Sequence, residues 1–205
     1  MDFDFDRRID RRGTNSQKWD AMQDRYGISP DDGIAMWVAD RDFAAPPAVN
    51  ETLKNIAEHG VHGYFGNDRP YLAAIQHWMA SRHAWAVSPD WILSFHGLVH
   101  AISVAIQAFS EPGDGVILFS PVYHAFYRVI HANDRQVLES PLVEQDGRYH
   151  MDLDALAKSL TGNEKMVIIS SPHNPGGRVW SLQELRALAE FCERYDLLLI
   201  ADEIH

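Results

Sequence analysis

The sequence predicts an α/β fold with a doubly wound, mostly parallel sheet. Two short apolar runs, residues 166–170 and 197–201, flank a segment with the apolar period of a helix, residues 182–192. A strand–helix–strand unit of this length implies parallel strands and a right-handed crossover. The same alternation of apolar runs and helical patterns extends upstream to residue 91. This alternation is typical of α/β proteins.

The first 45 residues differ from the rest because they lack a sustained apolar period. We expect residues 1–45 to form a polar N-terminal arm, with Asp2–Arg12 as its charged start. An arm this polar has little surface to bury alone, so we expect it to lie on another part of the protein or on a neighbouring subunit. Residues 46–205 are expected to form part of an α/β domain.

Local signals predict the elements of that domain in order. Pro46-Pro47 suits the first turn of a helix, which Gly60 can end, and a second helix should run from Pro70 to about Trp85. Asp152 and the Ser181-x-x-Glu184 capping box mark two later helix starts. The helix over residues 98–109 is apolar on most sides and is expected to be buried, and Phe126, Val129 and Ile130 mark a further helix. The expected strands are residues 91–95, 116–119, 136–139, 166–170 and 197–201.

Composition excludes several classes of partner. The 18 basic and 29 acidic residues give a net charge of −11, which argues against nucleic acid and anionic membrane surfaces. No apolar run approaches the ~20 residues of a membrane span, and the acidic N-terminus does not resemble a signal peptide. The single cysteine, Cys192, cannot form an internal disulfide, so we expect a reducing, cytoplasmic location.

The candidate site lies where strands end. Gly97, Tyr123, Asn174 and Asp202 each follow an expected strand, and parallel strands share one carboxyl edge. Together they offer helix-start amides for phosphate, an aromatic face, a neutral amide and a carboxylate. That set suits a flat, anionic, nitrogen-containing heterocycle.

Plainer interpretations stay open for each residue taken alone. Asp202 could be a turn acid and Tyr123 a core aromatic. His96-x-x-x-His100 has the spacing of metal ligands, but it lacks the glutamate of the zinc-protease motif and a third ligand. We therefore predict no metal site.

Several segments together resemble the fold type I pyridoxal-phosphate enzymes. More narrowly, they resemble the cystathionine β-lyase (C–S lyase) branch of the PatB/MalY kind in the class I/II aminotransferases. The fold implied is the large domain of these transferases, incomplete at 205 residues and preceded by the arm. The resembling segments, in order, are Arg11–Asp20, Met36–Phe43, His59–Tyr64, Ser120–Tyr123, Pro172–Trp180 and Asp202–His205.

The resemblance implies a role for each matching residue around pyridoxal 5′-phosphate. Asp202 would pair with the pyridine nitrogen, and Asn174 would bond the ring oxygen, near which His205 also lies. Tyr123 would stack on the ring. The phosphate would be bound at the turn formed by Gly97, Leu98 and Val99. In a homodimer, Tyr64 would contact the phosphate bound in the neighbouring subunit. The substrate would lie near Val38, Ala39 and Asp40. Arg41 and His62 depart from the pattern of the branch, so the exact substrate stays open.

Three functions remain possible from the sequence. The first is a C–S β-lyase that acts on cystathionine or related cysteine conjugates and releases thiol, pyruvate and ammonia. The second is an aminotransferase on the same scaffold, and the third is a non-catalytic fragment or interaction module.

The positions of the lysines bear on activity. The family carries its Schiff-base lysine some tens of residues after the motif that Asp202–His205 matches, whereas the four lysines here are Lys18, Lys54, Lys158 and Lys165. We therefore expect the 205-residue chain alone to lack the catalytic lysine, to be inactive, and to bind the cofactor weakly and without a covalent bond.

Overall fold

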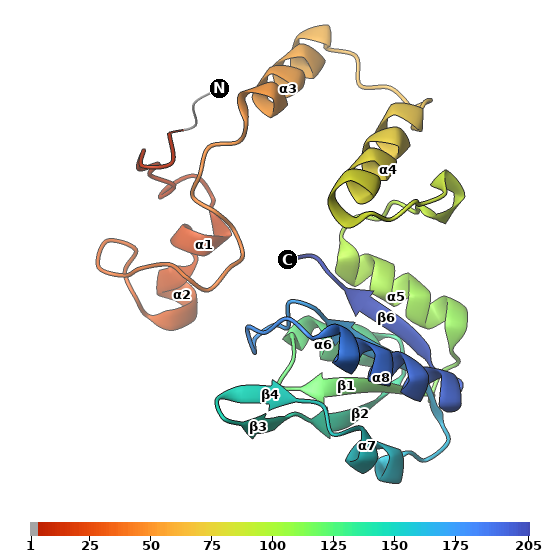
Figure 1. The fold of residues 1–205 in the computed structure, drawn as a ribbon. Coiled ribbons are helices and arrows are strands. Elements are labelled where there is room, and N and C mark those ends of the chain that lie inside the picture. Colours follow the sequence, from red (N-terminus) through yellow and green to blue (C-terminus); the bar gives the residue numbers. More distant parts are fainter. Residues whose placement is uncertain (1–3) are drawn as a thin grey trace. The chain divides into compact units, whose positions relative to one another are not determined.

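The computed structural model describes residues 4–205, which divide into two units between Pro70 and Tyr71 (Figure 1). The first two residues of the expected charged arm, Asp2 and Phe3, lie outside the described residues. The domain boundary expected at residue 45 stays a prediction about the whole protein.

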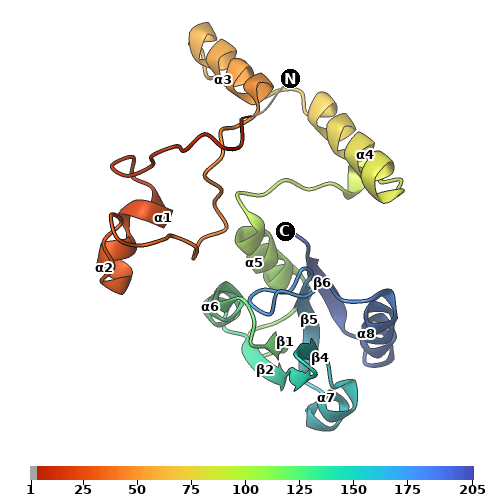
Figure 2. The ribbon, with the colours of Figure 1, turned by 60° about the vertical axis from the view of Figure 1, so that its left-hand side comes forward.

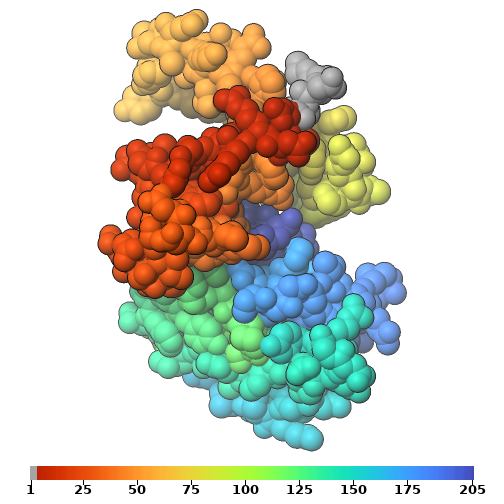
Figure 3. All heavy atoms as spheres, turned by 90° about the vertical axis from the view of Figure 1, so that its left-hand side faces the viewer, coloured from red at the N-terminus to blue at the C-terminus, as the bar shows by residue number. Residues whose placement is uncertain are grey.

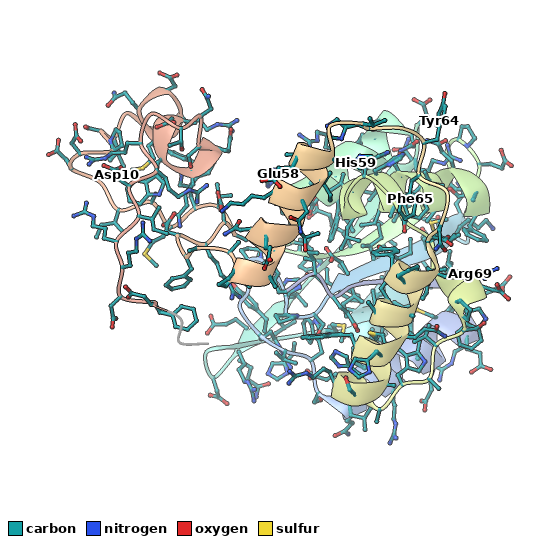
Figure 4. The ribbon with its side chains drawn as sticks, turned by 90° about the horizontal axis from the view of Figure 1, so that it is seen from above. Asp10, Glu58, His59, Tyr64, Phe65 and Arg69 are labelled. Atoms are coloured by element: carbon teal, nitrogen blue, oxygen red, sulfur yellow. The ribbon has the colours of Figure 1, made fainter. Side chains whose placement is uncertain are left out.

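The first unit holds three helices: α1 (Gln17–Asp20), α2 (Met22–Tyr26) and α3 (Pro47–His59). As predicted, α3 starts on a proline, and it ends at Gly60, whose φ of 70° is the left-handed conformation that glycine tolerates. The helices α1 and α2 were not predicted, because four or five residues are too few to show a helical period. Figure 4 shows the loop that leads from His59 through Tyr64 and Phe65 to Arg69.

The second unit is built on a four-stranded sheet in the order β2-β1-β5-β6. Its strands are β1 (Gly115–Ser120), β2 (Gln136–Pro141), β5 (Glu164–Ser170) and β6 (Leu198–Asp202). Every neighbouring pair in this sheet is parallel. The predicted α/β class with a parallel sheet is therefore confirmed.

Helices cover both faces of this sheet, as the view in Figure 2 shows for α6 and α8. The helices of this unit are α4 (Arg69–His83, which begins just before the unit boundary), α5 (Leu98–Phe109), α6 (His124–Ala132), α7 (Leu153–Ser159) and α8 (Leu182–Arg194). Of these, α5 to α8 supply the side chains that pack on the sheet. Alternate side chains of β1 separate into two cores: Ile117 and Phe119 pack with α7 and α8, whereas Val116 and Leu118 pack with α5 and α6. This two-residue alternation is what a strand covered on both faces requires.

The predicted helix starts carry the predicted caps. The Asp152 carboxylate accepts a hydrogen bond from the Ala155 N–H at 2.9 Å. At α8 the capping box is reciprocal: Ser181 Oγ accepts from the Glu184 N–H at 3.3 Å, and the Glu184 carboxylate accepts from the Ser181 N–H at 2.8 Å. These bonds satisfy helix-end amides that would otherwise lack partners.

Two expectations about the segment before the sheet are wrong. Residues 91–95 do not form a strand: Pro89–Trp91 is a 3-10 turn, and the extended residues that follow pair with no strand of the described chain. In addition, α5 is not buried on most sides, because only Ile102 and Ile106 are buried while Val104 and Phe109 face out. The described residues cover only the side of α5 that rests on the sheet and α6.

A hairpin in the second unit escaped prediction. Strands β3 (Val143–Gln145) and β4 (Arg148–His150) pair antiparallel around Asp146 and Gly147, whose φ values are 52° and 73°. An Asp-Gly pair is the usual sequence signal for this two-residue turn, so the hairpin could have been predicted from the sequence. Hydrophobic residues from 142 to 160 pack together over one face of the sheet. The surface of this part of the chain is teal to cyan in the space-filling view (Figure 3).

The connections define a switch point in the sheet. From β1 the chain crosses through α6 to β2, and from β5 it crosses through α8 to β6 on the opposite side. The two crossovers leave in opposite directions, so a crevice is expected between the loops after β1 and β5. In open α/β sheets, ligands bind at such a crevice beyond the carboxyl ends of the strands.

None of the helices in residues 4–205 is both long and apolar enough to cross a membrane.

Candidate functional site

The strand register brings three candidate residues to one edge of the sheet. Leu118 pairs with Ile168, and Ile168 pairs with Ile200, so β1, β5 and β6 run level with each other. Their carboxyl ends therefore meet at one edge. Asp202 ends β6, and the loops that carry Tyr123 and Asn174 begin there.

Gly97 reaches the same edge by a different route from the one expected. It follows no strand, but a five-residue turn joins the end of α5 to the start of β1, so the two elements run antiparallel. Because α5 and β1 are each about 20 Å long, the N-terminus of α5 lies near the carboxyl edge. Gly97 has a φ of 100°, which residues with a side chain rarely adopt, and a Cβ placed on it would meet no atom within 4 Å. The amides of Leu98 and Val99 that follow begin the helix and suit an anion.

Tyr123 is the N-cap residue of α6 and is half-buried. Its ring meets Phe126 edge-on, with the centroids 5.6 Å apart and the planes at 84°. Phe126 is fully buried in the core between α6 and the sheet. The Tyr123 ring therefore packs on a side chain of the core, which restricts its orientation.

Asn174 lies in the loop between β5 and α8. Its backbone N–H donates to Ser170 Oγ at 3.2 Å, so the main chain turns back over the end of β5. The side-chain carboxamide is half-buried and has no hydrogen-bond partner within residues 4–205. A half-buried amide of this kind has both a donor and an acceptor to offer to a ligand.

Asp202 is the last residue of β6, and its backbone is still hydrogen-bonded to the chain that follows β5. Its backbone oxygen accepts from the Ser171 N–H at 3.0 Å, and its carboxylate accepts from the Ile204 N–H at 3.1 Å. Three residues further on, His205 is exposed. The edge therefore presents a carboxylate held by a regular strand.

His173 is a buried residue at this edge to which the sequence analysis assigned no role. It is 2% exposed, and Nε2 lies 2.8 Å from the carbonyl oxygen of Pro121 in the loop after β1. Burial lowers the pKa of His173 below the usual 6.5 by disfavouring the imidazolium ion, and the positive charge of Arg178 adds to this. The ring is therefore neutral at neutral pH. The only sequence signal was a histidine in a short polar turn, which does not reveal the opposing loop.

This lowered pKa predicts an acid-sensitive fold. As pH falls below 6.5, the unfolded chain gains a proton at His173 while the folded chain does not, so the free energy of unfolding must fall until the lower folded pKa is reached. Urea unfolding at about pH 7.5 and about pH 5.5 should therefore show a larger acid-induced loss for the unaltered protein than for His173→Phe, which cannot titrate. Equal losses in the two proteins would contradict the prediction.

In the first unit, an ion cluster holds the segment that contains Val38, Ala39 and Asp40. Lys18 Nζ donates to the backbone oxygen of Asp40 at 2.8 Å and to the Asp42 carboxylate at 2.7 Å. Arg11 donates to the carboxylates of both Asp40 and Asp42, at 2.7 and 2.9 Å. The hydrogen bond from Lys18 is the main reason that the pKa of Asp42 falls to about 2.

Replacing Lys18 with Met should loosen this segment. Lys18 is buried, so its loss leaves the Asp42 carboxylate and the Asp40 carbonyl without their ammonium partner, at a cost of about 1.5–3 kcal/mol. Hydrogen exchange across residues 37–43 should become faster. Lys54→Met is the matched control, because Lys54 is exposed on α3, and its exchange pattern should be unchanged. Equal behaviour of the two variants would refute the role of the cluster.

Tyr64, the residue expected to reach a neighbouring subunit, is fully exposed in the loop between α3 and α4 (Figure 4). It belongs to the first unit, as do Val38, Ala39 and Asp40. Their roles at the cofactor and the substrate remain predictions.

A polar hollow of about 450 Å³ lies beside the start of α8, away from Asp202, and its walls include Arg148, His150, Arg178 and Glu184. Its one carboxylate already has partners, since Glu184 accepts from Arg178 at 2.5 Å and lies 3.7 Å from His150. The capping box also occupies the first amides of α8. We therefore assign the hollow no ligand. Nor does any group of three or more His, Cys, Asp or Glu side chains in residues 4–205 have the arrangement to hold a metal ion.

The carboxyl edge thus defines an α/β protein whose switch point suits a flat, phosphorylated nitrogen heterocycle. The unpartnered carboxamide of Asn174, the open space at Gly97 and the carboxylate of Asp202 each match one part of such a ligand. Comparison with known proteins gives the family. Residues 35–205 match the model of aminotransferase class I and II, and the chain belongs to this family.

Two curated relatives cover nearly all of this chain. It is 43% identical to cystathionine beta-lyase PatB of Bacillus subtilis (strain 168), over 98% of this chain and 52% of PatB. It is 37% identical to MalY of Escherichia coli (strain K12), over 99% of this chain and 52% of MalY. The chain spans about half the length of these relatives.

A solved structure supports the same placement. Cystalysin from Treponema denticola, which contains a pyridoxal 5′-phosphate cofactor, superimposes with a TM-score of 0.92 and 38% identity, covering 100% of this chain and 52% of cystalysin. The predicted resemblance to the PatB/MalY branch of this family is confirmed.

Proposed function

We propose that this chain forms the cofactor-binding edge of a pyridoxal-phosphate-dependent carbon–sulfur β-lyase. The observation that carries the proposal is the convergence of Gly97, Tyr123, Asn174 and Asp202 on one edge of the sheet, at its switch point. The 43% identity to a cystathionine beta-lyase and the likeness to cystalysin support the choice of activity.

Each residue at the edge can bind one part of pyridoxal phosphate. The first amides of α5, at Leu98 and Val99, bind the phosphate. Tyr123 covers one face of the ring, and the Asn174 carboxamide donates to the ring oxygen. The Asp202 carboxylate keeps a proton on the ring nitrogen through a charge-assisted hydrogen bond. Bound pyridoxal phosphate supplies an electron sink for the carbon next to the amino group of the substrate.

The overall reaction is an elimination. A base takes the α-proton of the cysteine conjugate, and the β-carbon–sulfur bond breaks with its electron pair leaving on sulfur as a thiolate. Water then releases pyruvate and ammonia. We propose cystathionine or a related cysteine conjugate as the substrate, with the backbone of Val38, Ala39 and Asp40 beside it, held by Lys18 and Arg11.

The assembly proposed is a homodimer. Tyr64 has no buried contact in its own unit and is fully exposed, which leaves its hydroxyl and ring available to a neighbouring subunit. We propose that it contacts the phosphate bound there, and that His205 lies near the ring oxygen within its own subunit.

The test is a product assay on the whole protein. Cystathionine should yield a thiol and pyruvate in equal amounts when pyridoxal phosphate is present. The match to the aminotransferase model favours one alternative, in which the amino group passes to a keto acid. Amino-group transfer without thiol release would select that alternative, and the absence of both products would reject the proposal.

A further inference from the structure

We propose that His173 is a positioning residue that fixes the loop carrying Tyr123 against the loop carrying Asn174. The inference rests on the proposed function, since it explains how two ligand-binding loops keep their spacing. The loops follow β1 and β5, the two strands that border the switch point. Figure 2 shows these two strands side by side in the middle of the sheet.

The link joins residues far apart in sequence. His173 Nε2 lies 2.8 Å from the carbonyl oxygen of Pro121, 52 positions earlier in the chain. Pro121 stands two residues before Tyr123, and His173 directly precedes Asn174. One hydrogen bond therefore couples the aromatic residue on one loop to the amide residue on the other.

The direction of each hydrogen bond follows from its chemistry. A carbonyl oxygen can only accept, so Nε2 must carry the hydrogen, and in the neutral ring Nδ1 is then an acceptor. Nδ1 lies 3.4 Å from Ser170 Oγ, which itself accepts the Asn174 N–H at 3.2 Å. The serine hydroxyl can thus donate to Nδ1. The hydrogen bonds form one chain: the Asn174 N–H donates to Ser170 Oγ, the Ser170 hydroxyl donates to Nδ1 of His173, and Nε2–H of His173 donates to the Pro121 carbonyl oxygen.

Packing holds the ring in this orientation. The ring of Trp180 meets His173 at 5.4 Å and 69°, and its Nε1–H donates to the backbone oxygen of Ser170 at 2.9 Å. On another side, a methyl group on Gly176 would come within 2.8 Å of His173 Cδ2. The guanidinium of Arg178 lies over the ring of Trp180, 4.2 Å from its centroid. Burial of the ring of His173, and to a smaller extent the charge of Arg178, disfavours the imidazolium ion, so the ring keeps the hydrogen-bond pattern of its neutral form.

Within residues 4–205, no other hydrogen bond joins the two loops. The β5–α8 loop is closed on itself by two backbone bonds at 2.7 Å, from His173 N–H to Arg178 O and from Gly177 N–H to His173 O. These bonds shape the loop but do not reach β1. A binding site needs its side chains placed to within about 0.5 Å, and His173 supplies that constraint between the two loops.

The test compares two substitutions in the whole protein. His173→Phe keeps a ring against Trp180 but removes both hydrogen bonds, whereas His173→Gln keeps a donor that can reach the position of Nε2. His131→Phe is the control, because His131 is exposed at the end of α6. Two measurements are made: hydrogen exchange by mass spectrometry, and the dissociation constant of pyridoxal phosphate.

For His173→Phe we expect faster exchange in residues 120–125 and 171–178 with β1 and β5 still protected. We also expect pyridoxal phosphate to bind about tenfold more weakly, as the loss of one buried hydrogen bond implies. His173→Gln should stay within about threefold of the unaltered protein, and His131→Phe should match it.

The other outcomes bear separately on the link made by His173 and on the proposed binding of pyridoxal phosphate. Loop exchange and affinity that are unchanged in His173→Phe would overturn the inference, as would a His173→Gln protein that behaves like His173→Phe. If the unaltered protein binds no pyridoxal phosphate, the proposed function fails, and the exchange rates of the two loops still decide whether His173 links them. If His173→Phe exchanges rapidly throughout, protected loops in His173→Gln support the link and unprotected loops overturn it.

Discussion

Asp202→Asn is expected to reduce β-elimination by the whole protein about 150- to 4,000-fold. The asparagine keeps the shape of the side chain and can still accept the Ile204 N–H, which the carboxylate now accepts at 3.1 Å. It lacks the charge that stabilises a protonated ring nitrogen. Removing one member of a desolvated charge pair costs about 3–5 kcal/mol, which corresponds to this range. The measurement is the rate of pyruvate release at saturating cofactor.

The control for Asp202→Asn is its neighbour. Glu203→Gln removes the same charge one residue later, from an exposed side chain that continues past the strand end. Its rate should stay within about twofold of the unaltered protein, because exposed charges contribute little. Equal losses in both variants would show a general effect of charge at this edge. An unchanged rate in Asp202→Asn would show that the Asp202 carboxylate does not take part in the reaction.

Phe126→Ala is expected to produce the largest loss of stability. Phe126 is fully buried between α6 and the sheet, and Tyr123 leans on its ring. Truncating a buried phenylalanine costs about 3–5 kcal/mol, because the cavity left behind does not fully collapse. The free energy of unfolding in urea should fall by this amount, and the support under Tyr123 should be lost with it.

Phe109→Ala is the matched control for Phe126→Ala. Phe109 lies at the end of α5 and is 63% exposed, so the same substitution removes little buried surface and should change the free energy of unfolding by less than about 0.5 kcal/mol. A loss at Phe109 as large as that at Phe126 would mean that α5 is covered in solution. That result would contradict the packing described for this helix.

The sequence predicted the parts of the fold that depend on neighbouring residues. The caps at Asp152 and Ser181 were predicted because each needs only a few consecutive residues. The meeting of Tyr123, Asn174 and Asp202 at one edge was also predictable, because parallel strands joined by crossovers must end at the same side. Local pattern and chain topology were sufficient for these features.

Features that depend on distant residues could not be predicted. Residues 91–95 have the composition of a strand, but a strand needs a neighbour to bond, and none of the described strands pairs with them. The apolar composition of α5 gave no indication of which side chains stay exposed. The contact of His173 with Pro121 joins residues 52 positions apart. No local pattern identifies that partner.

The most direct test of the central claim is an NMR titration of backbone amides with pyridoxal phosphate. The claim is that the carboxyl edge of the sheet holds the cofactor. It predicts the largest shift changes at Leu98, Val99, Asn174 and Asp202, with inorganic phosphate moving only the first two. Changes centred instead on the polar hollow at Arg148 and Glu184, or no localised change at all, would contradict it.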